Sequence, residues 1–355
     1  MPNIPLKQGE HWQPLPRSEV IKAVERKRPA RIPLVYARWW GEGLVEQYGE
    51  RLKALERYPE DAMVVLIEPL DFTKMGLSWE LPSGGAHDSS CVLDDWQKLD
   101  EFIEKMPDPE TDPQFEQVAR LAEQSRKDDR YFLFGWWRLF FERPWGIRGM
   151  ENLLTDYYLY PEQVQRLHAA LCDLYLKYLQ RAVRELKPDG FWTSDDLGHQ
   201  TQPFMRPAIF RELIKPDYVR IGSFLRQQKV HWWLHSCGNN TALLDDLIEA
   251  GVQVFHPVQK GTMDELAVAQ KYGDRLTFLT GIDVQHTLQE KPPEGVRQEV
   301  RFLIDTFDRP EGGMCIAAGN GIVAGTPYEC IEAFLDEALE YGFKHREKFI
   351  TQKGQ

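Results

Sequence analysis

Eight short runs rich in β-branched and aromatic residues alternate with longer stretches of helical period along this chain. That alternation is typical of a parallel sheet, because parallel neighbours need a crossover connection, usually a helix, between them. Eight such units are the count of a (β/α)8 TIM barrel, so we predict an α/β fold of this class. The predicted strands cover residues 31–36, 63–67, 131–135, 190–194, 230–235, 252–256, 276–281 and 313–318.

One interval between the predicted strands is longer than a crossover helix requires. Residues 68–130 separate the second and third strands, and we interpret part of this interval as an insertion. Within it, LSWELPSGGAHDSSCVL (77–93) has the composition of two short strands around a Ser-Gly-Gly turn. No fixed-period repeat or low-complexity tract marks a boundary, so we predict a single barrel domain over 1–355 that carries this insertion.

The charge balance limits the partners of this protein. It has 55 acidic and 43 basic residues and therefore a net charge of −12. This charge argues against nucleic acid or an anionic membrane as its main partner. No run approaches the roughly 18 apolar residues of a membrane span, and the N-terminus lacks the layout of a signal peptide. The five cysteines are scattered, which disfavours a disulfide framework. We therefore expect a cytoplasmic protein that acts on a small molecule.

Polar and aromatic side chains follow the predicted strands, which is where barrel enzymes carry their sites. In chain order these candidates are Arg38 with Trp39 and Trp40, Glu68, Trp136 with Trp137 and Arg138, Asp195 and Asp196, His235 and Cys237, His256 and Gln259, Asp283 and His286, and Asn320. The tryptophan doublets favour a flat aromatic or hydrophobic ligand, although core packing is an alternative use for the same indoles.

The sequence His-Ser-Cys at 235–237 is the most specific motif in the chain. Residues two apart in an extended strand point the same way, so the imidazole of His235 and the sulfur of Cys237 can face one cavity. Zinc binds this pair of donors, but it needs three or four ligands in total. The alternative is structural: a histidine that bonds a carbonyl and a buried thiol.

Asp195 and Asp196 follow the fourth predicted strand. Adjacent residues on a strand end point oppositely, so we expect one carboxylate to enter the cavity and the other to cap the next element. Burial of the inward carboxyl beside tryptophans would raise its pKa and suit it to proton transfer near neutral pH. Two turn-forming aspartates are the alternative.

Over nearly its whole length the chain resembles the uroporphyrinogen decarboxylase superfamily, whose fold is a (β/α)8 barrel. The segments that carry the resemblance are RGMENLL (148–154), PDGFWTSDDLGHQ (188–200), FRELIKPDYVRIGSF (210–224), LHSCG (234–238), LIEAGVQVFHPVQ (247–259), MDELAVAQKYGDRLTFLTGIDVQHTL (263–288) and TPYECIEAFLDEALEYG (326–342).

The superfamily holds two chemistries. True uroporphyrinogen decarboxylases use no metal and grip a tetrapyrrole with a segment like RQAGRY and an aspartate after strand two. The corresponding ARWWGEG (37–43) keeps the first arginine as Arg38, but Glu42 replaces the second, and Glu68 falls near the aspartate. The reversed charge at Glu42 opposes binding of the tetrapyrrole carboxylates.

The other branch contains zinc-dependent methyltransferases that act with a corrinoid protein. Their motif is His-x-Cys after strand five and a cysteine after strand eight. His235 and Cys237 match the first part, but Asn320 stands where the cysteine would be, and Cys315 lies five residues earlier. A carboxylate could complete a zinc site instead, and the candidates are Glu68, Asp195 and Asp196.

The resemblance implies a methyltransferase that moves a methyl group from a methoxylated or similar substrate to cobalamin on a corrinoid partner, with zinc on His235 and Cys237. Proton transfer falls to Asp195 or Asp196. Two alternatives stay open: a metal-free decarboxylase or lyase of a non-tetrapyrrole acid, with Arg38 or Arg138 holding the carboxylate, and a barrel that binds a ligand without turnover.

Overall fold

The computed structural model describes residues 6–8, 11–77 and 91–351. Internal contacts divide the chain into two compact units, and each is described by itself. The first unit comprises residues 1–63, 125–132 and 253–355, and the second comprises residues 64–124 and 133–252. No helix in the described ranges is long and apolar enough to span a membrane.

The sheet of the second unit is parallel. β5 (Gly190–Ser194) pairs on one side with β4 (Tyr131–Trp136) and on the other with β6 (His231–His235). All three strands are buried along their whole length, as expected when both faces of a parallel sheet are covered. Only glycine fits at position 135 of β4, because a Cβ added there would lie 1.8 Å from the Trp192 carbonyl oxygen.

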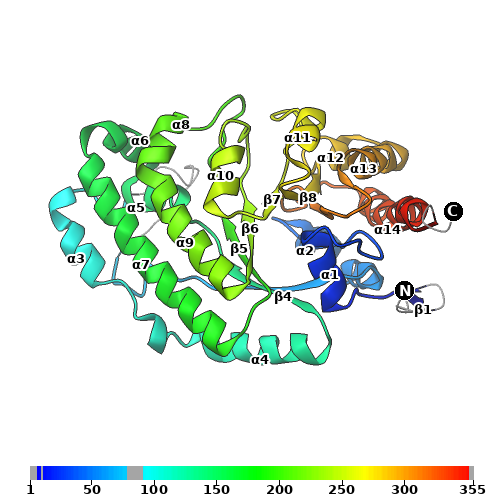
Figure 1. Ribbon diagram of the computed structural model, residues 1–355, viewed down its shortest axis with the longest axis horizontal. Helices are drawn as coiled ribbons and strands as arrows, with labels where there is room; N and C mark the ends of the chain where they lie inside the picture. The colour runs from blue at the N-terminus through cyan, green and yellow to red at the C-terminus, as the bar shows by residue number, and fades with distance from the viewer. Residues whose placement is uncertain (1–5, 9–10, 78–90, 352–355) are drawn as a thin grey trace. The chain divides into compact units, whose positions relative to one another are not determined.

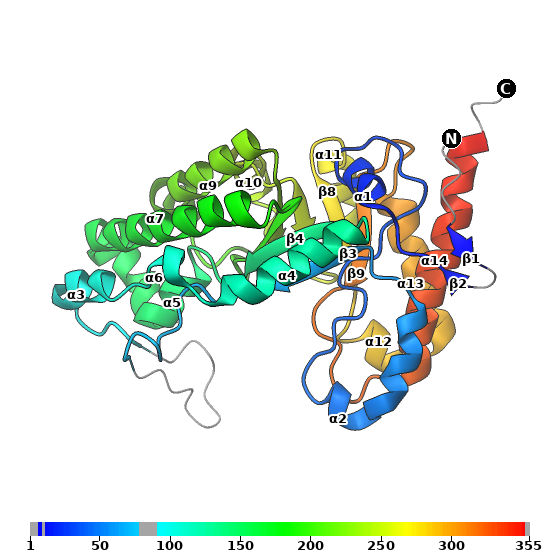
Figure 2. The same ribbon diagram turned by 90° about the horizontal axis from the view of Figure 1, so that it is seen from below.

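Helices cover this sheet. In Figures 1 and 2, α7 (Pro161–Glu185) and α9 (Lys215–Gln228) lie side by side, and α10 (Leu244–Ala250) packs against α9. The remaining helical elements here are η3 (Trp96–Lys98), α3 (Leu99–Glu104), η4 (Pro109–Thr111), α5 (Glu142–Arg148), α6 (Met150–Leu159), α8 (Pro207–Ile209) and the π-helix η5 (Phe210–Ile214), while α4 (Gln114–Lys127) spans the boundary of the units.

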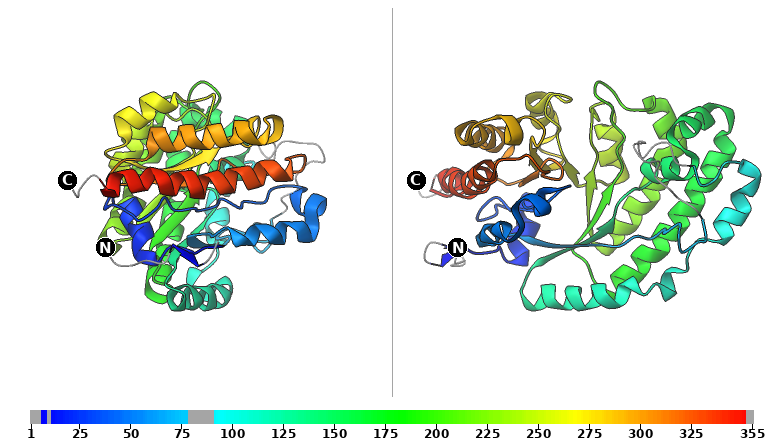
Figure 3. Two further views of the ribbon diagram at one scale, coloured as in Figure 1. Left: turned by 90° about the vertical axis from the view of Figure 1, so that its right-hand side faces the viewer. Right: turned by 180° about the vertical axis from the view of Figure 1, so that it is seen from behind.

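The strands of the first unit are also parallel: β8 (Thr277–Ile282) pairs with β7 (Val254–His256) and with β9 (Met314–Ala318). α13 (Pro293–Phe307) and α14 (Tyr328–Thr351) run side by side, as Figure 3 shows. The other elements are β1 (Lys7–Gln8), β2 (His11–Trp12), α1 (Arg17–Val24), α2 (Leu44–Tyr48), η1 (Gly49–Arg57), α11 (Glu265–Tyr272) and α12 (Thr287–Glu290), and β3 (Ala62–Leu66) spans the boundary of the units.

The predicted strand over 31–36 is wrong as a strand. The segment forms only an isolated parallel bridge, between Leu34 and Ile316 of β9. Pro33 has no N–H to donate, and Tyr36 has a φ of +57°, which lies outside the β region. A buried ion pair anchors the segment, since Asp61 accepts hydrogen bonds from the Arg31 guanidinium and from the Leu34 N–H, each 2.7 Å long.

The seven other predicted strands are confirmed, with ends shifted by at most two residues. The parallel α/β class is confirmed with them. Most of the predicted hairpin at 77–93 lies outside the described residues, and residues 96–127 of the predicted insertion are largely helical. The single-domain organisation stays a prediction.

Candidate metal centre

Strands β5 and β6 end side by side in the second unit. Ser194, the last residue of β5, pairs with His235, the last residue of β6. Asp196 and Cys237 each follow two residues later, so the register brings both to the same edge of the sheet. The Cys237 N–H donates a hydrogen bond of 2.8 Å to Asp196 Oδ1, which ties the two loops together.

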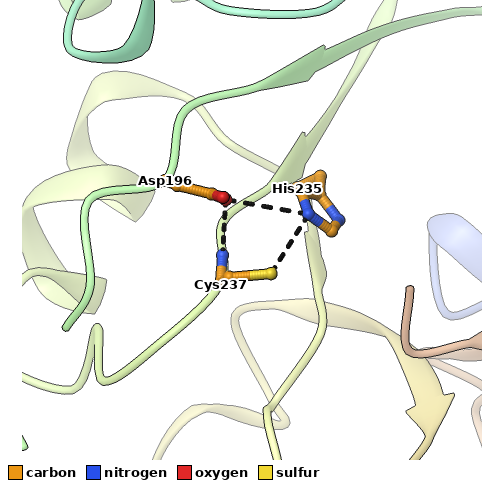
Figure 4. A group of neighbouring side chains, drawn as sticks. All are labelled: Asp196, His235 and Cys237. Atoms are coloured by element: carbon orange, nitrogen blue, oxygen red, sulfur yellow. Dashed lines mark hydrogen bonds and ion pairs between the residues drawn. The ribbon is translucent and has the colours of Figure 1, made fainter. Parts of the chain in front are cut away.

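Three side chains converge at this edge. Cys237 Sγ lies 3.3 Å from His235 Nε2, and Asp196 Oδ1 lies 3.7 Å from the same nitrogen. Figure 4 shows the three side chains turned toward one another. Among the described residues they are the one group of three or more His, Cys, Asp or Glu side chains placed to hold a metal ion, with ligand atoms within 4.8 Å. We call Asp196, His235 and Cys237 the Asp–His–Cys cluster.

The imidazole of His235 is held in its neutral form. The residue is 4% exposed, and burial lowers its pKa to about 3 because the imidazolium would lose its hydration. The rings of Trp137 and Trp192 lie 5.8 Å and 6.1 Å from the imidazole ring. A neutral imidazole with an available lone pair is the form that coordinates a metal.

Asp195 is not part of the cluster and has partners of its own. Its carboxylate accepts hydrogen bonds of 2.8 to 3.1 Å from the backbone N–H groups of Phe140, Phe141 and Glu142, and one of 2.7 Å from the Tyr218 hydroxyl. Burial raises the pKa of Asp195 to about 6, and the donated hydrogen bonds oppose that rise. Asp195 therefore shapes the loop that leads into α5, while its neighbour joins the cluster.

Glu142 is a candidate residue that the sequence analysis missed. It begins α5, and its Oε2 accepts a hydrogen bond from the Ser194 hydroxyl. Burial, followed by the charges of Asp196 and Asp195, raises the pKa of the Glu142 carboxyl well above its usual range. Burial also raises the pKa of Asp196. No motif marks Glu142, because its place depends on the hydrogen bond from its own N–H to Asp195.

Glu68 and Arg138 lie in the same unit but outside the cluster. Glu68 Oε1 accepts hydrogen bonds from the Arg143 guanidinium at 2.6 Å and from the Leu70 N–H at 3.0 Å. Arg138 is half-buried with a φ of +69°, and its N–H donates to Ser194 Oγ at 2.9 Å. Burial, and next the charge of Arg143, lowers the pKa of Arg138. A positive φ strains the backbone of a non-glycine residue, and strain of this kind is common at functional sites.

The tryptophan doublets divide between core and edge. Trp136 is fully buried and packs on Phe191 and Tyr175, with ring centroids 4.6 Å and 5.2 Å away. The doublet at 232–233 is also fully buried. Trp137 is partly exposed, and its ring lies 5.8 Å from that of His235.

Several predicted rim residues lie in the first unit. Arg38 donates its N–H to Glu60 Oε1 at 2.8 Å, and its Nε lies 3.6 Å from the same oxygen. The rings of Trp39 and His256 lie 6.3 Å apart, and His256 Nε2 is 3.0 Å from the Ala318 carbonyl oxygen. Arg38 and His256 are thus engaged within their own unit.

The remaining predicted residues of this unit are similarly placed in loops. Trp40 forms an isolated parallel β-bridge with Ile322. The Gln259 carbonyl oxygen accepts a hydrogen bond from the Thr262 hydroxyl in the turn that follows it. Asn320 is exposed, and its Oδ1 accepts the N–H of the next residue at 2.7 Å. Cys315 is fully buried within β9, and burial raises the pKa of its thiol well above the usual range, so it stays protonated.

Comparison with known proteins places the chain in a family. The sequence profile of the family described as Uroporphyrinogen decarboxylase (URO-D) matches residues 52–341, so the chain belongs to this family. A methyltransferase from Methanosarcina mazei has a similar structure, with a TM-score of 0.67 over 93% of this chain and 99% of its own. The two sequences are 14% identical, so the likeness shows the shared fold alone.

Two other structures are less similar. A B12-independent methionine synthase from Shewanella sp. W3-18-1 has a TM-score of 0.39 and 10% identity over 66% of this chain and 68% of its own. A D-psicose 3-epimerase has a TM-score of 0.40 and 10% identity over 91% of this chain and 98% of its own. Scores this low carry no argument about function. A search of curated proteins found no match.

Proposed function

We propose that this protein is a zinc-dependent methyltransferase that moves a methyl group from a methoxylated or similar small substrate to cobalamin carried by a corrinoid partner protein. The observation that carries the proposal is the convergence of three different donor atoms, an oxygen, a nitrogen and a sulfur, in the Asp–His–Cys cluster. Membership of the URO-D family and the fold shared with a methyltransferase agree with it.

The geometry favours a metal over a Cys–His–Asp nucleophile. In a catalytic triad the carboxylate holds one ring nitrogen of the histidine and the nucleophile faces the other. Here the single nitrogen Nε2 of His235 faces both Cys237 Sγ at 3.3 Å and Asp196 Oδ1 at 3.7 Å. Donors gathered around one point are the arrangement of ligands around a cation.

The donor set fits zinc. Imidazole nitrogen, thiolate sulfur and carboxylate oxygen are its usual ligands, and neighbouring ligand atoms of a tetrahedral site stand about 3.3 to 3.6 Å apart. The separations of 3.3 Å and 3.7 Å around His235 Nε2 are close to these values. Asp196, His235 and Cys237 would hold the ion and leave one position open, as catalytic sites do. Zinc bound there would supply a Lewis acid that polarises a substrate oxygen.

The residues around the cluster would orient the substrate. Trp137 is partly exposed and stands edge-on to His235, so it offers a wall to an aromatic or hydrophobic group. Arg138, half-buried next to it, offers a positive charge to an anionic substituent.

Glu142 is the residue we assign to proton transfer. Asp195 is occupied by its four donors, and Asp196 belongs to the cluster, which leaves Glu142 as the third carboxyl of this edge. Its Oε2 accepts the Ser194 hydroxyl, so Oε1 would carry the proton. As the methyl–oxygen bond breaks, the oxygen keeps the bonding pair and takes this proton, and the carbon bonds to Co(I) through the electron pair of cobalt.

The test is methyl transfer itself. Zinc-loaded protein is incubated with Co(I) cobalamin and a panel of methoxylated aromatic and aliphatic compounds, and methylcobalamin is followed by absorbance. We expect product with at least one compound, and at least about a hundredfold slower formation with Cys237→Ala. No product across the whole panel would contradict the proposal.

A metal-free decarboxylase is the second candidate, and Glu142 is the observation that favours it. A half-buried carboxyl whose pKa is raised well above its usual range, near the charge of Arg138, is suited to protonate a carbanion after loss of CO₂ from a bound carboxylate. Conversion of a carboxylic acid by chelator-treated protein, unaffected by Cys237→Ala, would favour this reaction over methyl transfer.

Two further parts of the proposal concern the whole chain. We propose that the sheet closes into an eight-stranded barrel, with segment 33–36 in the place of the first strand. Within the first unit, Val35 donates its N–H to the Ile316 carbonyl, and Leu34 accepts the N–H of Asp61, so the segment is bonded on both sides. A cytoplasmic location goes with this function, because a reducing compartment keeps the Cys237 thiol free.

A further inference from the structure

A buried amide holds the loop that carries Cys237. Asn240 is fully buried, and its Nδ2 donates to the carbonyl oxygens of Ser236 and Cys237, each at 3.0 Å, and to that of Gly238 at 3.3 Å. The amide has two hydrogens, so the three contacts share them. The carbonyls of three consecutive residues are therefore turned toward one side chain.

A second link runs from this amide to the loop that carries Asp196. The Ser236 hydroxyl donates to Asn240 Oδ1 at 3.2 Å, and its oxygen accepts the Leu197 N–H at 3.1 Å. Leu197 directly follows Asp196 in the chain. Ser236 is also fully buried, so water does not compete for these bonds. Leu197, Ser236 and Asn240 thus form a continuous hydrogen-bonded chain between two ligand-bearing loops.

Two glycines let the loops touch through their backbones. Gly238 has a φ of +78°, and a Cβ added there would lie 2.1 Å from the Gly198 carbonyl oxygen. A Cβ added to Gly198 would lie 2.6 Å from the Cys237 carbonyl oxygen. No space remains between the loops, so a shift of the Cys237 loop must shift the Asp196 loop as well.

We infer that Asn240 is a positioning residue for the Asp–His–Cys cluster. Asn240 sets Cys237 against Asp196 through the hydrogen-bonded chain of Leu197, Ser236 and Asn240, which we call the clip. The inference rests on the proposed metal site and assigns to it an outer shell that the His-x-Cys motif does not include. Partners of this kind fix the direction of the metal ligands, and their loss typically lowers metal affinity about 10- to 100-fold.

The variants separate the effect of the Asn240 hydrogen bonds from the effect of the volume of its side chain. Asn240→Asp keeps the size of the side chain and the Oδ1 acceptor but loses both N–H hydrogens, and Asn240→Ala removes the amide. Asn239→Ala is the matched control, because the adjacent side chain accepts the Thr241 N–H at 3.1 Å. Ser236→Ala removes only the hydroxyl that links the loops, and it serves where the Asn240 variants fail to fold.

The measurements are the zinc dissociation constant, by competition with a chelator well below the unfolding temperature, and the thiolate-to-cobalt absorption band of the Co(II)-substituted protein. We expect the constant to rise about 10- to 100-fold and the band to weaken in the Asn240 variants, with a smaller rise in Ser236→Ala. Asn239→Ala should match the wild type. A purely structural role would lower the unfolding temperature and leave both readouts unchanged, and that result would overturn the inference.

A wild-type protein that binds no zinc would contradict the proposed function instead. The clip is then judged on metal-free protein, from the rate at which iodoacetamide alkylates Cys237, measured on the peptide that contains it. A rate altered in Asn240→Asp and Ser236→Ala, but not in Asn239→Ala, would support positioning of the thiol. Equal rates in all variants would overturn it.

Discussion

The strand ends of the two units carry the same kinds of side chain, but the polar atoms of these side chains have different partners. In the second unit, Asp196, His235 and Cys237 converge on one another. In the first unit, His256 Nε2 lies within hydrogen-bond distance of the Ala318 carbonyl oxygen. The Asp283 carboxylate accepts hydrogen bonds from the backbone N–H groups of the turn that follows it. Polar residues after a strand therefore do not by themselves define a site, and what distinguishes the cluster is that three side chains converge on one point.

Position relative to the strand end explains much of the difference. Asp195 and Asp283 each lie one residue past the last residue of a strand, and both bind backbone N–H groups. His235 is itself a last residue, and Asp196 and Cys237 lie two residues past theirs, so alternation directs all three to the same side. The comparison yields three predictions.

The largest effect is expected at Asp195. Asp195→Ala leaves four donors, three of them buried, without an acceptor, so the free energy of unfolding should fall by about 3 to 5 kcal/mol. Asp196→Ala, in contrast, should cost about 1 kcal/mol or less, because the bond it removes is one accepted from the backbone N–H of Cys237 in the adjoining loop. Urea unfolding of the two variants measures both values. Equal losses would break the distinction between the two neighbours.

The two histidines at strand ends should differ in metal affinity. His235→Ala removes a cluster ligand, so the zinc dissociation constant should rise about a hundredfold or more, whereas His256→Ala should leave it unchanged. Competition with a chelator measures the constants. A loss of affinity in His256→Ala comparable to that in His235→Ala would contradict the assignment of the ion to the Asp–His–Cys cluster.

The smallest effect is a pH dependence in the first unit. Burial raises the pKa of Glu60 to about 7, and Arg38 opposes the rise. The folded state therefore binds this proton more tightly than the unfolded state, so the free energy of unfolding should fall as pH rises from about 4.5 to about 7. Glu60→Gln cannot titrate and should remove about 1 to 2 kcal/mol of that fall. Unfolding curves at several pH values measure it, and identical slopes for both proteins would refute the assignment.

The fold is largely predictable from the sequence, with one local exception. Seven strands follow from apolar runs bounded by turn residues, because buried parallel strands need continuous apolar segments. Segment 31–36 has the same composition, but Pro33 and the positive φ of Tyr36 limit it to a single bridge. Composition alone does not reveal the backbone conformation of Tyr36.

The candidate site is only partly predictable. The spacing of His235 and Cys237 indicates a shared cavity, because alternation in a strand is a local property. The choice among Glu68, Asp195 and Asp196 stays open in the sequence, since it depends on which residue ends β5. Glu142 cannot be found from the sequence, because the hydrogen bond that places it runs from its own N–H to the Asp195 carboxylate, 53 positions away.

The measurement that tests the account most directly is the zinc content of protein purified without chelator, beside Cys237→Ala and Cys315→Ala. We predict about one zinc per chain in the wild type and in Cys315→Ala, and none in Cys237→Ala, because Cys237 belongs to the Asp–His–Cys cluster and Cys315 is a buried thiol of β9. A wild type that remains free of zinc after zinc is offered, or a Cys237→Ala variant that retains it, would contradict the metal centre.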